Sequence, residues 1–168
     1  KLLNKNVKVE NIRGNIDTRI KKVESGEFDA TILALAGLKM LNLEKHAKET
    51  FSIKDFIPTA GQGIIAVQCR DDDEYTKKIL KKINHKETNI CATAEREVLK
   101  VLEGDCDTAI GAFSFIEGTK LNLTAELFSI DGKKRYYCRQ NNEVHLAQKL
   151  GQEVGNILKN KSEGNYKR

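Results

Sequence analysis

The sequence predicts an α/β portion followed by an α+β portion, and three observations lead to this fold class. In about the first sixty residues, apolar runs of strand length alternate with stretches of helical periodicity, which is the rhythm of a parallel α/β unit. In about the last eighty residues, a long helical pattern precedes three strand-like runs separated by short glycine-containing turns. A content of 39% hydrophobic and 32% charged residues is typical of an ordered globular chain.

The α/β portion is assigned from four consecutive segments. Residues 7–12 alternate apolar and polar side chains and predict a strand, and residues 13–29 predict a turn and a helix that stops at Gly26. Residues 29–35 form a nearly continuous apolar run, as expected for a strand that is buried on both faces. The pattern then predicts a further helix over residues 37–49.

The middle of the chain opens at Pro58, the only proline in the sequence. It precedes the glycine-rich turn Ala-Gly-Gln-Gly at residues 60–63 and an apolar strand over residues 64–69. Residues 71–85 predict a helix whose first turn is acidic and whose last turn carries lysines, which suits the helix dipole. A second helix is predicted over residues 87–104.

The last part of the chain predicts a meander closed by a helix. Residues 109–118, 120–132 and 133–140 are three strand-like runs separated by turns. Residues 142–160 carry an apolar stripe at helical spacing, and the tail that follows, residues 161–168, is expected to be loosely packed.

Composition limits the classes of function. The net charge of +5, from 29 basic and 24 acidic residues, permits an acidic small molecule or a nucleic acid as partner but requires neither. Aromatic residues make up 6% and tryptophan is absent, which disfavours a stacking platform for single-stranded nucleic acid. No apolar run approaches the roughly 20 residues of a membrane span. The first residues lack a signal-peptide pattern and begin as if within a strand, so we expect a portion of a longer protein.

The four cysteines are Cys69, Cys91, Cys106 and Cys138. None belongs to a Cys-x-x-Cys pair and no histidine lies close to one in the sequence, so no structural zinc site or other metal site is expected. Because the chain has no secretory signal, free thiols in a reducing compartment are expected.

Cys106 follows the helix-stopping Gly104 and lies between Asp105 and Asp107. Local chemistry leaves three alternatives for it: a buried small apolar residue, a metal ligand or a reactive thiol. Neighbouring aspartates and a helix C-terminus raise a thiol pKa, and no local histidine offers a base, so the pattern favours an inert cysteine. If the thiol reacts, its partner must be a strong electrophile.

Two further groups of residues have alternative interpretations. Arg13 and Arg19 flank the start of a predicted helix, where two guanidinium groups would make a carboxylate clamp. The alternative is that they are solvated or paired with Asp17 or Glu24. The turn at residues 60–63 lacks the spacing of a phosphate-binding loop, so it indicates a tight turn or hinge instead.

Three blocks in order resemble the porphobilinogen deaminase (hydroxymethylbilane synthase) family. RGNIDTRIKKVESGEFDATILALAGLKMLNL, residues 13–43, is similar to the arginine-bearing segment of that family's second domain. IPTAGQGIIAVQCR, residues 57–70, resembles its crossover strand. NHKETNICATAEREVLKVLEGDCDTAIGAF, residues 84–113, resembles its cofactor-attachment segment.

The resemblance implies a transferase that polymerises four porphobilinogen molecules, with loss of ammonia, into hydroxymethylbilane on a covalently bound dipyrromethane primer. It places Cys106 where the family joins this cofactor through a thioether. It also implies that Arg13 and Arg19 bind carboxylates and that Gln62 lines the same cleft. The partners implied are porphobilinogen and polypyrrole intermediates, with no nucleic acid and no membrane.

The resemblance also implies a domain organisation. Residues 1–57 would be the later part of domain 2, in a partial domain that resembles periplasmic binding proteins. Residues 58–83 would be a crossover that completes domain 1, and residues 84–168 would be domain 3, a three-stranded antiparallel sheet packed with helices. The family's catalytic aspartate would lie upstream, so we expect no catalytic residue in this chain and no activity from it alone. The missing N-terminal segment of the same protein is then a partner, and the compartment would be the cytoplasm, or a plastid if an upstream transit peptide exists.

The chain departs from the family pattern at three positions. Asp105 replaces a glycine, Ala109 replaces a proline, and Met40 stands where many members have an arginine. These changes bear on cofactor loading or turnover. The alternative function is a non-catalytic module, derived from the same fold, that binds a small anion or another protein.

Overall fold

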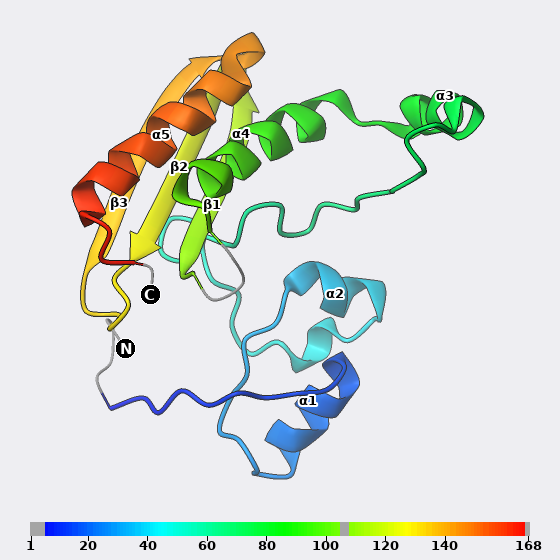
Figure 1. Ribbon diagram of the computed structural model, residues 1–168. Coiled ribbons are helices and arrows are strands. Elements are labelled where there is room, and N and C mark those ends of the chain that lie inside the picture. The colour runs from blue at the N-terminus through cyan, green and yellow to red at the C-terminus, as the bar shows by residue number, and fades with distance from the viewer. Residues whose placement is uncertain (1–5, 105–107, 167–168) are drawn as a thin grey trace. The chain divides into compact units, whose positions relative to one another are not determined.

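The computed structural model describes residues 6–104 and 108–166. The chain divides into two compact units, Lys1–Ser52 and Ile53–Arg168, and each is described by itself. In chain order, the elements are α1 (Ile16–Glu24), α2 (Leu35–Met40), the 3-10 turn η1 (Glu44–His46), α3 (Glu74–Ile83), α4 (Lys86–Leu102), β1 (Ile110–Glu117), β2 (Lys120–Phe128), β3 (Arg135–Glu143), the 3-10 turn η2 (Val144–Leu146) and α5 (Ala147–Ser162) (Figure 1).

The first unit is built from α1, α2 and η1. Gly26 has a φ of 78°, a left-handed conformation that favours glycine, and it follows the end of α1 as the sequence predicts. α1 packs closely on α2, because a methyl group at Gly37 would lie 2.8 Å from Ile16 Cδ1. His46 Nδ1 lies 3.2 Å from Glu24 Oε1 and joins the end of α1 to η1.

The strands predicted over residues 7–12, 29–35 and 64–69 are absent from the described structure, so these three predictions are wrong. A strand requires main-chain hydrogen bonds to a neighbouring strand. None of these three segments has such a neighbour among the described residues. The side chains of Ile65 and Val67 are 79% and 59% exposed, although the apolar run predicts their burial.

The second unit contains one antiparallel sheet in the order β1-β2-β3, which confirms the predicted meander. The pairing places Ala112 opposite Ala125, and Ala125 opposite Cys138. α4 and α5 lie side by side across one face of this sheet (Figure 1), so the unit has one layer of helices and one layer of strands.

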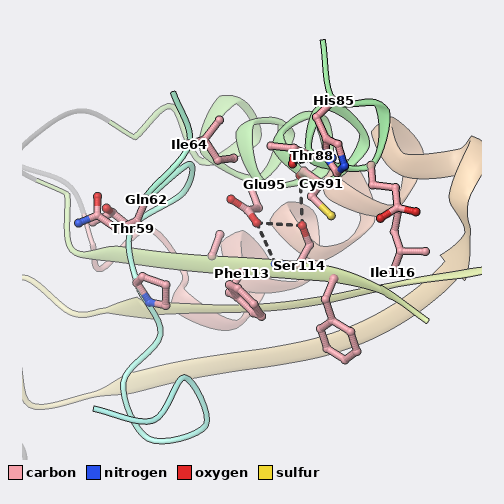
Figure 2. A pocket seen from close by; sticks show the side chains of 14 residues that line it. Thr59, Gln62, Ile64, His85, Thr88, Cys91, Glu95, Phe113, Ser114 and Ile116 are labelled. Carbon is pink, nitrogen blue, oxygen red and sulfur yellow. Dashed lines mark hydrogen bonds between the residues drawn. The ribbon is translucent and has the colours of Figure 1, made fainter. Parts of the chain in front are cut away.

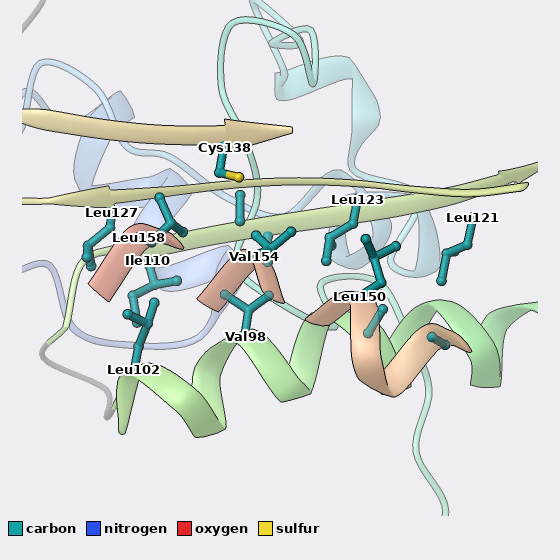
Figure 3. Packing of buried hydrophobic residues seen from close by; sticks show 14 of the residues in the cluster. Val98, Leu102, Ile110, Leu121, Leu123, Leu127, Cys138, Leu150, Val154 and Leu158 are labelled. Carbon is teal, nitrogen blue, oxygen red and sulfur yellow. The ribbon is translucent and has the colours of Figure 1, made fainter. Parts of the chain in front are cut away.

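The core lies between these two layers (Figure 3). Every second residue of β2 from Leu121 to Leu127 points at the helices and is fully buried, as a period of two predicts. Asn122 and Glu126, on the opposite face of the strand, are buried as well. The helices supply the opposing side chains Val98, Leu102, Leu150, Val154 and Leu158. The amphipathic helix predicted over residues 142–160 is therefore confirmed, but it begins later than predicted, at Ala147, after a 3-10 turn.

Two glycines let α4 and α5 approach closely. A methyl group at Gly151 would lie 2.7 Å from Glu97 Cβ, and one at Gly155 would lie 2.7 Å from Val101 Cβ. Real side-chain atoms do not tolerate this spacing, so glycine is required at both positions by contact rather than by backbone angle.

The described part of the tail, residues 161–166, is held against the second unit, contrary to the sequence-based expectation of loose packing. Tyr166 is only 4% exposed, and its hydroxyl donates a hydrogen bond of 3.2 Å to the carbonyl of Leu102 at the end of α4. The amide of Ile130 also donates to the carbonyl of Asn165. The last carbonyls of a helix have no partner within the helix, so the tail satisfies one of them.

In the described part of the chain, no helix combines the length and apolar character needed to cross a membrane.

The close approach of α4 and α5 predicts the effect of adding one methyl group. Gly151→Ala is expected to lower the free energy of unfolding by about 1–3 kcal/mol because the methyl group forces the helices apart. Asn156→Ala, at an exposed position of the same helix, is the matched control and is expected to be neutral or slightly stabilising. Urea unfolding followed by circular dichroism measures both, and a Gly151→Ala variant as stable as the control would contradict the packing described.

Candidate functional site

A cavity of about 360 Å³ lies in the second unit, where the segment from Pro58 to Ile64 faces the first half of α4 and the strand β1 (Figure 2). Its polar lining includes Gln62, Glu95 and Ser114. The cavity therefore contains one of the residues that the resemblance assigns to the cofactor cleft, Gln62.

The turn that carries Gln62 is built from two overlapping hydrogen-bonded turns. The amide of Gln62 donates to the carbonyl of Thr59, and the amide of Ile64 donates to the carbonyl of Gly61, both at 3.0 Å. Gly61 and Gly63 have φ angles of 75° and 82°, which explains the Gly-Gln-Gly sequence. The prediction of a tight turn here is confirmed, and the side chain of Gln62 is exposed at the cavity.

Glu95 holds this turn against the sheet and the helix. Its side chain comes from α4 and the residue is only 5% exposed. One carboxylate oxygen accepts from the amide of Gly61 at 2.8 Å. The other accepts from both the amide and the hydroxyl of Ser114, also at 2.8 Å (Figure 2). A buried carboxylate is tolerated when donors surround it in this way.

Glu95 was not singled out from the sequence, although a signal for it was present. Glu95 lies among the apolar positions of α4, next to Ala94 and three residues before Val98, which are both fully buried. A carboxylate on the buried face of an amphipathic helix needs a compensating partner, so this position could have been singled out.

The segment before the turn lies along the outer edge of β1. The amide of Ala112 donates to the carbonyl of Pro58 at 2.9 Å. A methyl group at Gly111 would lie 2.7 Å from the carbonyl oxygen of Ile57, so glycine permits the close approach. One wall of the cavity is thus fixed by a main-chain contact.

Cys91 also lines the cavity, but it is not an activated thiol. Burial raises the pKa of Cys91, the hydrogen bond with Ser114 opposes part of this rise, and the nearby carboxylates of Glu95 and Glu87 add to it. The neutral thiol therefore predominates near neutral pH.

Arg13 and Arg19 lie in the first unit, around the start of α1. Arg13 is exposed, whereas Arg19 is half-buried and its Nε donates to the carbonyl of Gly14 at 2.8 Å. Among the described residues, neither guanidinium group forms an ion pair, so neither is paired with Asp17 or Glu24.

Cys106 and Asp105 lie outside the described residues. On one side, Glu103 has a φ of 49° and the amide of Gly104 donates to the carbonyl of Leu99, which ends α4. On the other side, the carbonyl of Ala109 accepts from the amide of Phe128.

The other two departures from the family pattern can be examined directly. The hydrogen bond at Ala109 uses the carbonyl, which a proline also possesses, so alanine and proline serve equally in this contact. Met40 is 75% exposed at the end of α2, so an arginine there would project into solvent as well.

No cluster of three or more metal-binding side chains occurs among residues 6–104 and 108–166.

Comparisons with known proteins agree with the resemblance. Residues 1–78 match the family model described as "Porphobilinogen deaminase, dipyromethane cofactor binding domain", and residues 89–160 match "Porphobilinogen deaminase, C-terminal domain". The chain belongs to the porphobilinogen deaminase family. Arg13, Arg19 and Gln62 fall within the first match, and Cys106 falls within the second.

Curated relatives named porphobilinogen deaminase support the same family. The relative from Coxiella burnetii (strain Dugway 5J108-111) is 42% identical over 151 residues, which are 90% of this chain and 49% of the relative. The relative from Chloroherpeton thalassium is 39% identical over 161 residues, which are 94% of this chain and 51% of the relative. The relative from Desulforamulus reducens is 41% identical over 150 residues. The chain thus spans about half the length of the relatives it matches.

Taken separately, each unit carries side chains whose chemistry suits an anionic dipyrromethane. Arg19 uses only its Nε in the turn, which leaves both Nη groups for a bidentate bond to a carboxylate. Gln62 offers an amide group at the cavity, and the charge of Glu95 is already compensated by three hydrogen bonds. These observations agree with the cofactor named by the first family model.

The raised pKa of Cys91 predicts how this thiol responds to pH. Because the raised pKa leaves less thiolate at a given pH, alkylation of Cys91 by iodoacetamide should be slow at pH 7.5. The rate should increase only when the pH exceeds the pKa of an ordinary thiol. Peptide mass spectrometry of the folded chain measures the rate, with the urea-unfolded chain as the reference. Equal rates at pH 7.5 in the folded and unfolded chains would contradict the burial described.

Proposed function

We propose that this chain is the C-terminal portion of a hydroxymethylbilane synthase, which joins four porphobilinogen molecules, with loss of ammonia, on a dipyrromethane primer. The observation that carries the proposal is the pair of family-model matches, which lie in order and together span residues 1–78 and 89–160. A bound dipyrromethane supplies the pyrrole end to which the substrate rings are added.

The residues of this chain would bind and orient the growing pyrrole chain. Each pyrrole of the family's substrate carries an acetate and a propionate, so the growing chain is strongly anionic. Arg13 and Arg19 would pair with these carboxylates, at roughly 1.5–3 kcal/mol for each charge-assisted hydrogen bond. Gln62 would hydrogen-bond the ligand from the wall of the cavity.

Cys106 would act as a permanent tether. The aminomethyl carbon of a porphobilinogen unit would lose its amino group, and the Cys106 sulfur would form a carbon–sulfur bond to this electrophilic carbon, with the thiol proton leaving on the departing ammonia. A sufficiently reactive electrophile captures an ordinary thiol, so this step does not depend on a lowered pKa at Cys106.

The domain organisation belongs to the same proposal. Residues 1–57 would complete a second domain resembling periplasmic binding proteins, residues 58–83 would cross back to a first domain, and residues 84–168 would form the third. The exposed apolar side chains of Val7, Ile65 and Val67 support it, because they lie in segments that the sheets of these two domains would cover. The rest of both sheets, and the catalytic aspartate, would come from the N-terminal half of the protein.

The tether predicts a mass difference. When the chain and the N-terminal half of its own protein are produced together, the polypeptide with Cys106 should carry the added mass of one dipyrromethane. Cys106→Ser should remove this addition, because the serine hydroxyl is a poorer nucleophile than the thiol. Intact mass spectrometry measures both, and Ehrlich's reagent gives an independent colour test.

Cys138→Ser, at a buried position of the sheet, is the matched control and should retain the added mass. An unmodified Cys106 together with a bound small anion would contradict the proposal and favour the non-catalytic anion-binding module.

The chain alone is predicted to be inactive. Purified 1–168 should form no uroporphyrin-type product from porphobilinogen, since the catalytic aspartate would lie in the other half. Addition of the N-terminal half should restore turnover, measured by absorbance after oxidation of the product. Turnover by 1–168 alone would contradict this division of roles.

A further inference from the structure

We propose that Glu95 is a positioning residue, which fixes the turn from Thr59 to Gly63 and so presents Gln62 to the ligand of the cavity. This inference rests on the proposed function for the identity of the ligand, an anionic pyrrole. The contacts that support it lie entirely within the second unit and among its described residues.

The scaffold that carries Glu95 is rigid. The neighbouring residue, Ala94, is fully buried, and its carbonyl oxygen lies directly against Gly151 of α5. Ser114 belongs to β1, and its hydroxyl lies 3.2 Å from the carbonyl of Cys91, one turn before Glu95 on α4. The helix and the strand therefore hold the carboxylate at a defined position.

The turn itself is intrinsically adaptable. Gly61 and Gly63 flank Gln62, and glycine loses more conformational entropy on ordering than any other residue. The hydrogen bond from Gly61 to Glu95 links this flexible turn to the rigid helix at a distance of 2.8 Å. A ligand that meets a fixed Gln62 avoids the entropy cost of ordering the turn on binding.

Core packing alone does not explain a carboxylate at this position. Burying a charged group costs free energy, and an apolar side chain would fill the space between α4 and β1 without that cost. What an apolar side chain cannot provide is an acceptor for Gly61. The same carboxylate also receives the amide of Ser114, so it ties the turn to the strand as well as to the helix.

The test is Glu95→Gln in the protein assembled with its N-terminal half. The amide group keeps the shape of the side chain but places an N–H₂ group opposite one of the present donors. Glu97→Gln is the matched control, because Glu97 lies on the same helix and its carboxylate instead accepts from Gln152 of α5 at 3.0 Å.

Two readouts separate positioning from general stability. Amide hydrogen exchange at Gly61 should rise roughly tenfold or more in Glu95→Gln and stay unchanged in Glu97→Gln. The KM for porphobilinogen should rise roughly tenfold with kcat within about twofold, since only ligand binding depends on the turn. The double variant Glu95→Gln with Gln62→Ala should show no additional rise in KM beyond the larger single effect.

If Glu95→Gln does not fold, Glu95→Asp takes its place. It retains a buried carboxylate on α4, but the side chain is one methylene shorter, so it should lose the bond to Gly61. Unchanged exchange at Gly61, or additive KM effects with Gln62→Ala, would overturn the proposal. A wild-type protein without a dipyrromethane adduct would instead overturn the proposed function, while exchange at Gly61 would still report on Glu95.

Discussion

The second unit depends on the burial of one face of β2 beneath α4 and α5. Four alternating residues of this strand, from Leu121 to Leu127, are fully buried, and both helices supply side chains to the same layer. Burying a large aliphatic side chain contributes roughly 1.5–3 kcal/mol, so this layer provides most of the driving force for the unit. Because Gly151 and Gly155 bring the helices into contact with each other, α4 has no freedom to slide.

A fixed α4 organises the parts of the site that the structure describes. Its first half carries Cys91 and Glu95 to the cavity, and its last turn precedes Cys106, the tether of the proposed function. The end of the helix is held from α5 as well, since Lys159 Nζ lies 3.4 Å from the carbonyl of Val101 and 3.6 Å from the carboxylate of Glu103. The same packing therefore supports both the wall of the cavity and the approach to the loop.

The sequence predicted the elements that pair within the chain and failed for the three strands that do not, for one physical reason. The meander and α5 find their partners within the chain, so periodicity and turn residues were sufficient to identify them. The strands predicted at residues 7–12, 29–35 and 64–69 depend on pairing with segments that the described residues do not supply. Strand propensity describes a side chain that suits a pleated surface, and it cannot create the neighbouring strand.

The candidate site shows the same contrast. Gln62 was singled out because the resemblance that carries it is local in sequence, whereas Glu95 contacts a turn 34 residues away. The resemblance supplied the roles of Cys106, Arg13 and Arg19. Their chemistry alone left the alternatives open, and the structure adds that the two guanidinium groups are not engaged in ion pairs within its described part.

The contact between Pro58 and β1 has a consequence for solubility. The outer edge of a sheet presents unpaired amides and carbonyls to which another chain can add a strand, which promotes aggregation. Here the carbonyl of Pro58 takes the amide of Ala112, and the carboxylate of Glu95 takes the amide of Ser114. Two amides at the edge of β1 are thus occupied within the chain and are not open to a strand from a second copy.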